Sequence, residues 1–179
     1  MAWTTPKTWT DGSVLTAAEL NEQVRDNLDF LFDKPGAVYD VDEASNYTTS
    51  STSFVDVDAT DLALTITTGG GDVLIWLSPA VMTSTANVSV YFDVDIDGTR
   101  VAGDDGITKF TFFDAGASPE TIMNRATLGF VWLATGLAAG SHTFKLQWKH
   151  TNAAITTTLY AGAGTTYSDV HPQFGVKEL

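Results

Sequence analysis

The stretch of sequence that decides the fold is Val88-Ser-Val-Tyr-Phe-Asp-Val-Asp-Ile96, followed directly by Asp97-Gly98. Every second residue is apolar, and most of the residues in between are polar or acidic. A period of two is typical of a β-strand that buries one face, because successive side chains point to opposite sides of a strand. The Asp-Gly pair predicts a tight hairpin turn into Thr99-Arg-Val101. We therefore expect a strand with Val88, Val90, Phe92, Val94 and Ile96 facing the core, and Ser89, Tyr91, Asp93, Asp95 and Asp97 facing solvent.

The same alternation recurs along the rest of the chain after residue 54. In residues 142–150, for example, Phe144, Leu146 and Trp148 alternate with two lysines and a glutamine. No helical pattern interrupts the series, which disfavours a parallel α/β fold. The sequence predicts a mainly β protein, in which residues 54–179 form an antiparallel jelly-roll sandwich. Further strands are expected at residues 55–57, 62–66, 73–77, 107–113, 126–134, 142–150, 155–161 and 170–178.

Residues 1–35 follow a different pattern, which predicts an extended arm and one amphipathic helix. The arm, Trp3-Thr-Thr-Pro-Lys-Thr-Trp9, places two tryptophans in an otherwise small and polar segment. Thr16 and Glu19 have the spacing of a capping box, which predicts that a helix begins there. Pro35 predicts the end of this helix near residue 33, since proline disfavours helical geometry in the residue before it. Residues 36–53, rich in Ser, Thr and Asp, are expected as a linker to the β domain.

The predicted helix carries an apolar stripe that needs a partner surface. Its apolar residues recur at helical spacing. A helix of about four turns cannot bury such a stripe on itself. Its partner could be the β body of the same chain, other copies of the chain, or a host particle. The residues that would make this attachment are Trp3, Trp9, Leu20, Val24, Leu28, Leu31 and Phe32.

The composition narrows the classes of partner. The 179-residue chain has 22 acidic and 9 basic residues, a formal net charge of -13. Such a charge repels phosphate backbones and anionic lipid surfaces, so we expect no nucleic-acid and no membrane partner. The chain has no cysteine. Packing and contact with other subunits, rather than disulfides, are therefore the expected sources of stability. The first residues lack a secretion-signal pattern, so we expect no export.

The polar residues offer one metal-site pattern. Asp93-Val-Asp-Ile-Asp-Gly98 copies the opening of a calcium-binding loop, and Asp104 stands where that motif has a bidentate glutamate. The flanks alternate like strands rather than helices, so an acidic, solvent-facing strand is the favoured interpretation. A surface calcium site formed by Asp93, Asp95, Asp97 and Asp104 is the alternative.

The histidines give no catalytic pattern. His142, His150 and His171 do not have metal-ligand spacing on one helix, and the chain has no Gly-x-Ser-x-Gly nucleophile motif. We expect no catalytic residue, no cofactor and no enzyme activity.

Several motifs resemble those of small virion proteins of tailed phages and prophages. They are Trp3-Thr-x4-Trp9, Leu15-Thr-Ala-Ala-Glu-Leu-Asn21 and Arg25-Asp-Asn27 at one end, and Gly140-Ser-His-Thr-Phe-Lys-Leu-Gln-Trp148 and His171-Pro-Gln-Phe174 at the other. The C-terminal half is similar to the trimeric jelly rolls of the tumour necrosis factor class. The resemblance implies a homotrimer with a structural role in the virion. It would place a bulkier aromatic residue where this chain has Gly175.

Two functions follow from this resemblance. As a capsid decoration protein (a cement protein or head fibre), the trimer would be held on the particle by the arm and the stripe, which would become ordered on contact with capsid, tail or neighbouring subunits. As a tail-fibre or minor tail binding module, it would recognise a host glycan or surface protein through exposed aromatics such as Tyr47, Tyr91 or Tyr167. A competing interpretation of the arm is that Trp3 and Trp9 cap the base of their own sandwich.

Overall fold

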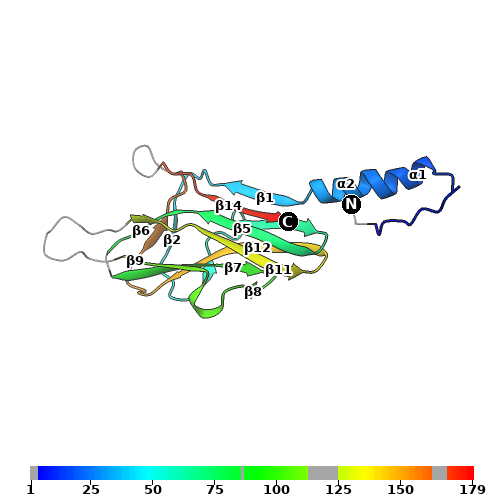
Figure 1. Ribbon diagram of the computed structural model, residues 1–179. Coiled ribbons are helices and arrows are strands. Elements are labelled where there is room, and N and C mark those ends of the chain that lie inside the picture. Colours follow the sequence, from blue (N-terminus) through cyan, green and yellow to red (C-terminus); the bar gives the residue numbers. More distant parts are fainter. Residues whose placement is uncertain (1–3, 86, 113–124, 163–168) are drawn as a thin grey trace.

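The computed structural model describes residues 4–85, 87–112, 125–162 and 169–179. Figure 1 shows an antiparallel β body with one helix projecting from its end. The fold is mainly β and forms a curled sandwich of the jelly-roll kind, as the alternating pattern predicted. The helix consists of α1 (Ala17–Leu20), a π-helical stretch (Asn21–Asp26) and α2 (Asn27–Phe32). Among the described residues, no helix is long and apolar enough to cross a membrane.

One layer of the sandwich is a curved sheet in two halves. Sheet A contains, in order, β1 (Gly36–Asp40), β14 (Gln173–Glu178), β5 (Gly71–Ser78) and β11 (Phe130–Leu137). Sheet B contains β10 (Arg125–Thr127), β6 (Ala80–Thr83), β13 (Thr157–Leu159) and β2 (Tyr47–Thr49). The chain passes from β5 to β6 at Pro79 and from β10 to β11 at Leu128 and Gly129, and Leu128 N donates to Pro79 O at 3.3 Å. Two paired strands therefore bend together where proline removes a ladder donor.

The opposite layer is sheet C. It contains β3 (Val55–Asp56), β12 (Gly140–His150), β7 (Val88–Ile96) and β8 (Thr99–Arg100), with β4 (Ala63–Thr68) also on β12 and β9 (Thr108–Phe112) on β7. A short 3-10 turn (Gly103–Asp105) lies between β8 and β9. The β7–β8 turn has positive φ at both Asp97 (53°) and Gly98 (90°). This is the hairpin geometry that an Asp-Gly pair favours, as predicted.

The core lies between the two layers and contains the predicted inward set. Val90, Phe92 and Val94 of β7 and Phe144, Leu146 and Trp148 of β12 are all buried. The rings of Phe92 and Trp148 stack with centroids 6.1 Å apart. The alternating pattern therefore gave the correct face at each of these positions.

Two expectations about strand boundaries are wrong. Residues 36–53 are not a plain linker, because β1 and β2 lie within them. β1 pairs with β14 over its five residues and completes sheet A. The strand expected at 126–134 is divided between β10 and β11 at Leu128 and Gly129. At this break the chain passes close to β5: a Cβ on Gly129 would stand 3.2 Å from Leu77 O.

The outward side of β7 also differs from the expectation. Asp93 and Asp95 point away from the core but are buried, with Asp93 fully inaccessible and Asp95 8% exposed. Arg100 from β8 lies over Asp93, with Nη1 3.5 Å from Oδ2. Phe54 and Arg100 contact each other above this face, with the guanidinium carbon 4.4 Å from the ring centroid. Side chains and the segment after β8 thus cover carboxylates that the sequence pattern placed in solvent.

Candidate functional site: the N-terminal arm and helix

The helix begins where the sequence predicts. Thr16 is the N-cap: its hydroxyl accepts from Glu19 N at 3.2 Å, and Glu19 Oε2 accepts from Thr16 N at 3.0 Å. A hydrogen bond and ion pair from Lys7, together with the bonds from Thr16, lower the pKa of Glu19 to about 2. The predicted capping box is therefore present and is joined by a lysine from the arm.

The arm lies along its own helix. Thr4 N donates to Asn27 Oδ1 and Asn27 Nδ2 donates back to Thr4 O, both at 2.9 Å. Further along, Lys7 N donates to Gln23 Oε1 at 2.6 Å. Asn27 is only 5% exposed, and its side-chain amide pairs with the arm as another backbone segment would. The chain itself therefore supplies contacts to residues 4–9, and the ordering of the arm by neighbouring subunits or particle proteins stays a prediction.

The π-helical stretch coincides with the residues that hold the arm. Gln23 lies within Asn21–Asp26 and Asn27 follows it, and Asn27 Nδ2 also donates to Gln23 O at 3.3 Å. A π turn rotates the following residues relative to an ordinary α-helix and is frequent at functional sites. The sequence did not predict that Asn27 binds the arm. A polar residue in a helix is expected to face solvent unless the arm is known to cover it.

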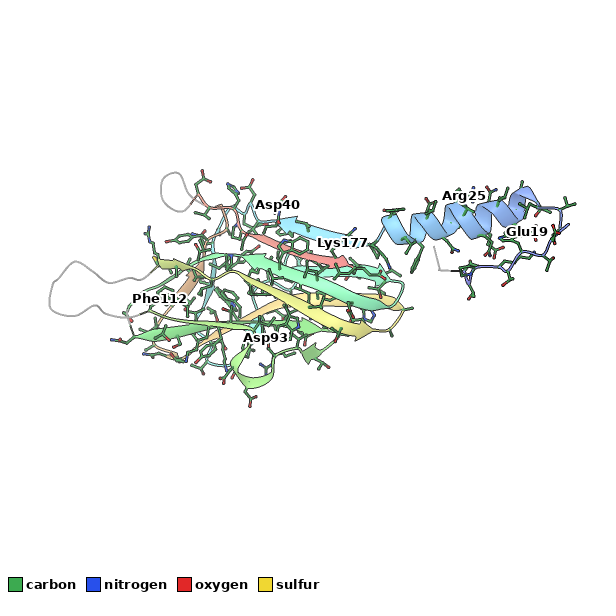
Figure 2. All side chains as sticks on the ribbon, viewed as in Figure 1. Glu19, Arg25, Asp40, Asp93, Phe112 and Lys177 are labelled. Atoms are coloured by element: carbon green, nitrogen blue, oxygen red, sulfur yellow. The ribbon has the colours of Figure 1, made fainter. Side chains whose placement is uncertain are left out.

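The apolar stripe of the helix is exposed, and the β body does not cover it. Figure 2 shows the helix standing clear of the sheets, with Glu19 on the side of the arm and Arg25 away from it. The exposed fractions in the stripe are 45% for Leu20, 50% for Val24, 46% for Leu28, 51% for Leu31 and 82% for Phe32. Of the three partner surfaces considered, the described part of the chain's own β body is not the one that covers the stripe.

Of the two tryptophans predicted to take part in attachment, the structure describes only Trp9. Trp9 is 41% exposed, and Lys7 Nζ lies 5.2 Å from its ring centroid. An apolar hollow beside the stripe is lined by Trp9, Thr10, Ser13, Leu15, Leu20 and Val24. Trp9 therefore extends the apolar surface of the helix rather than capping the sandwich. Trp3 lies outside the described residues.

A buried carboxylate fixes the direction in which the helix leaves the body. Glu178 of β14 is 1% exposed, accepts from Gly69 N at 3.0 Å and 3.2 Å, and pairs with Lys34 Nζ at 3.3 Å. Phe30 packs directly on Gly69, where a Cβ would stand 2.7 Å from its ring. These contacts come from the helix end, the β4–β5 turn and the C-terminal strand, so the helix is held in place by three distant parts of the sequence.

The four acidic residues of the calcium alternative are not arranged around a common point. Asp93 accepts from its neighbour Val94 N at 2.8 Å, and Asp95 accepts from Gly98 N at 2.8 Å. Asp97 is bonded to His142 and Thr143, while the side chain of Asp104 is fully exposed. Burial raises the pKa of Asp93, although Arg100 opposes the shift. In the described ranges no group of three or more His, Asp or Glu side chains is placed to hold a metal ion.

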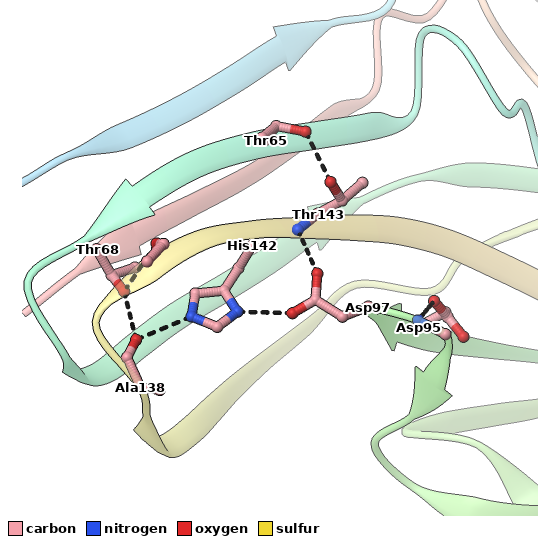
Figure 3. A network of polar contacts seen from close by, with 9 residues as sticks. Thr65, Thr68, Asp95, Asp97, Ala138, His142 and Thr143 are labelled. Atoms are coloured by element: carbon pink, nitrogen blue, oxygen red, sulfur yellow. Dashed lines mark hydrogen bonds and ion pairs between the residues drawn. The ribbon is translucent and has the colours of Figure 1, made fainter.

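His142 serves as a clamp at one end of sheet C, as Figure 3 shows. Its Nδ1 lies 2.6 Å from Asp97 Oδ2 and its Nε2 lies 2.9 Å from Ala138 O. Both ring nitrogens face acceptors, which favours the doubly protonated ring. These bonds raise the pKa of His142, the bond to Ala138 most, and the Thr143 N–H and His142 lower the pKa of Asp97. His150 is buried in the core, and His171 lies beside Asp169 and Asp42.

Two of the three aromatics proposed for ligand recognition, Tyr47 and Tyr91, lie in strands rather than on loops. Tyr91 is 8% exposed, with Lys149 Nζ 4.9 Å and Lys109 Nζ 5.2 Å from its ring centroid. Tyr47 is half-buried within β2, where burial raises the pKa of its hydroxyl. Tyr167 lies outside the described residues.

No protein-family profile and no curated protein matches the chain. Among solved structures it is similar to dimeric latent PorU from Porphyromonas gingivalis (9% identity, TM-score 0.38), over 81% of this chain and 13% of that one. It is also similar to structures of infectious bursal disease virus, the Gt strain (12% identity, TM-score 0.30, 79% and 35% of the two chains) and the Gx strain (14%, 0.28, 80% and 37%). The chain thus spans between 13% and 37% of the length of these structures. At these TM-scores the likenesses assign neither a family nor a function.

Proposed function

We propose that this chain is a non-enzymatic structural protein of a phage virion, a homotrimeric β sandwich held on the particle surface by its N-terminal arm and helix. The most specific form of the proposal is a capsid decoration protein. The observation that carries it is the projecting helix, whose stripe of Leu20, Val24, Leu28, Leu31 and Phe32 is exposed. An apolar surface of this kind in a soluble protein marks a place that a partner covers.

The geometry of the arm and helix supports attachment. The arm is already fixed on the helix through Asn27 and Gln23, and Glu178 fixes the helix on the body. The attachment surface is therefore formed before binding, which lowers the entropy lost on docking. Each apolar side chain that becomes fully buried contributes about 1.5–3 kcal/mol. In a trimer, three such helices would engage together and strengthen the hold by avidity.

Copy number in purified virions is the first test. Quantitative mass spectrometry should find this chain in the particles at a number comparable to that of the major capsid protein if it decorates the head. A few trimers per particle would instead identify a tail-fibre or minor tail module that recognises a host ligand. Absence from purified virions would overturn the proposal in both forms.

A second test separates the stripe from the rest of the protein. Recombinant chain is added to particles that were produced with an early stop codon in its gene, and bound chain is measured after sedimentation. The variant Leu28→Lys with Leu31→Lys should lose binding by more than about tenfold, because two charges enter the surface that must be buried. Glu22→Lys, an exposed change on the same helix away from the stripe, is the matched control and should bind as the parent does.

A further inference from the structure

A second apolar surface lies on the β body, on the outward face of sheet A. The register aligns Val38, Gly175, Trp76 and Val131 in one row across the four strands β1, β14, β5 and β11. Two residues further along β5 and β11, on the same face, Leu74 and Leu133 pair with each other. Val131 is 68% exposed, Val38 49% and Leu133 43%, while Leu74 and Trp76 are half-buried. We call the set Val38, Leu74, Trp76, Val131 and Leu133 the platform.

The platform is built by a specific contact between two strands. The Trp76 ring lies over Gly175 so closely that a Cβ at that position would stand 2.1 Å from it. Trp76 Nε1 donates to Gln173 Oε1 at 2.9 Å, which fixes the ring along β14. Gly175 therefore stands where the resemblance would place a bulkier aromatic because the indole of the neighbouring strand fills that space. The result is an apolar surface made of side chains from three strands, β1, β5 and β11, which passes over the glycine of β14.

Polar groups around the platform are already paired within the protomer. Gln173 Nε2 donates to Asp40 Oδ1 at 2.7 Å, and Lys177 donates to the carbonyl of Lys34. At the far side, Asp72 Oδ1 accepts from Gly136 N at 3.0 Å. An apolar centre within a rim of satisfied polar groups is the usual anatomy of a protein–protein interface.

The charge distribution favours a second copy of this chain as the partner. With a net charge of -13, copies repel one another at most surfaces. The platform residues carry no charge, and the exposed side chain beside Leu74 in the same row, Lys177, is positive. Two copies of this acidic chain therefore repel each other less at the platform than at their carboxylate-rich surfaces. The helix stripe lies on the projecting end and has the particle as its proposed partner, whereas the platform crosses the strands of sheet A, which belong to the body (Figure 1).

We propose that the platform is the surface through which copies of this chain meet in the trimer. This inference rests on the proposed trimer and adds the residues that form it. Symmetric homo-oligomers are the commonest assemblies of soluble chains. Contacts around a three-fold axis are heterologous, so each copy would turn its platform toward the axis and contact its two neighbours through different parts of it.

The test is the oligomeric state of a charged platform. In sedimentation experiments, Val131→Lys with Leu133→Lys should shift the monomer–trimer midpoint to concentrations more than about tenfold higher than in the parent. Lysine is chosen because added carboxylates would increase general repulsion between acidic subunits. Val170→Lys, a change of an exposed valine outside sheet A, is the matched control and should leave the midpoint unchanged.

Each outcome has a defined meaning. A parent trimer that persists in the doubly charged variant overturns the platform as the interface and leaves the trimer and the attachment function intact. A parent that is monomeric at all concentrations overturns both the trimer and this inference, while virion copy number still tests attachment. Near-UV circular dichroism shows whether the variant still folds. If it does not fold, the cysteine experiment described next tests the platform instead.

The chain contains no cysteine, so a single introduced cysteine gives an independent measurement of burial at its position. Cys at position 131, made by Val131→Cys, should react with a maleimide at least about tenfold more slowly in the assembled protein than in dilute monomer, because its site becomes buried. Val170→Cys should react at the same rate in both states. Equal rates at both positions in the assembled protein would contradict the inference.

Discussion

The outward faces of sheet A and sheet C have opposite chemistry within one sandwich. On sheet C, outward side chains are polar or charged and bond to one another: Lys145 and Gln147 contact Asp56, and Arg100 contacts Asp93. On sheet A, the outward positions carry the platform, in which Val38, Val131 and Leu133 are exposed in the single chain. Both faces follow the same alternating pattern with a buried inner side.

This difference indicates how each face is used. A charged face satisfied by its own side chains needs no partner and resists unwanted pairing, whereas an exposed apolar surface gains free energy when it is covered. The cover of Asp93 by Arg100 and Phe54 comes from the chain itself. For the platform, the described residues supply no such cover, so the contrast can be tested by mutating each face in turn.

The largest effect is expected at Gly175. Gly175→Ala places a methyl group where the Trp76 ring lies, so the ring must leave its site and lose packing, at a cost of about 2–3 kcal/mol in the free energy of unfolding. Urea denaturation measures this loss. In a Trp76→Ala background the same change should be neutral or slightly stabilising, since alanine restricts the unfolded strand more than glycine. Equal costs in both backgrounds would show that Trp76 is not the reason for the glycine.

On sheet C, removal of Arg100 is the corresponding change. Arg100→Met leaves the buried Asp93 carboxylate without its cation and should cost about 1–2 kcal/mol, less than a fully buried pair because Arg100 is partly exposed. Asp93→Asn in the same background should recover most of the loss, because the carboxylate that burial disfavours is then gone. Denaturation of the four proteins of this double-mutant cycle supplies the coupling free energy. Additive effects would contradict a direct interaction.

Much of the β body could be predicted from the sequence, because alternation is a local signal. The strand expected at 88–96 coincides with β7, and the helix expected at 16–33 is found at 17–32 with its capping box. β1 was missed because Gly36-Ala-Val-Tyr-Asp40 is short and lies in a segment rich in Ser, Thr and Asp. Its strand state depends on pairing with β14, at the other end of the chain.

The candidate site was predicted only in part, because the sequence signals local patterns but not contacts between distant residues. The exposed stripe follows from helical spacing, which is local. The packing of the arm on Asn27, the burial of Asp93 beneath Arg100 and the fit of Trp76 on Gly175 each join residues whose proximity depends on the whole fold. A single sequence with no known contacts gives no signal for such pairs.

The clamp at the end of sheet C predicts a moderate, pH-dependent effect. The pKa of His142 is raised above 6.5, so its contribution is full below that value and is lost as pH rises through the raised pKa. The pKa of Asp97 is lowered below 3.8, so its contribution is lost only as pH falls through that lower value. His142→Gln should therefore destabilise by up to about 1 kcal/mol near pH 5 and by much less near pH 9. A difference from the parent that stays constant across this range, in urea midpoints, would exclude the ionic clamp.

The smallest effect is expected for the exposed ion pair on sheet C. Lys145 Nζ lies 3.4 Å from Asp56 Oδ2, and both side chains are partly exposed, at 39% and 25%. Lys145→Met should change the free energy of unfolding by no more than about 0.5 kcal/mol, because water and salt screen the pair and Gln147 still donates to Asp56. The measurement is urea denaturation at low and high salt, with Lys109→Met, a lysine without a carboxylate partner among the described residues, as the matched control. If Lys145→Met cost as much as Gly175→Ala, the charged face would contribute to stability through its ion pairs, and the contrast between a self-satisfied face and a face that needs a partner would no longer hold.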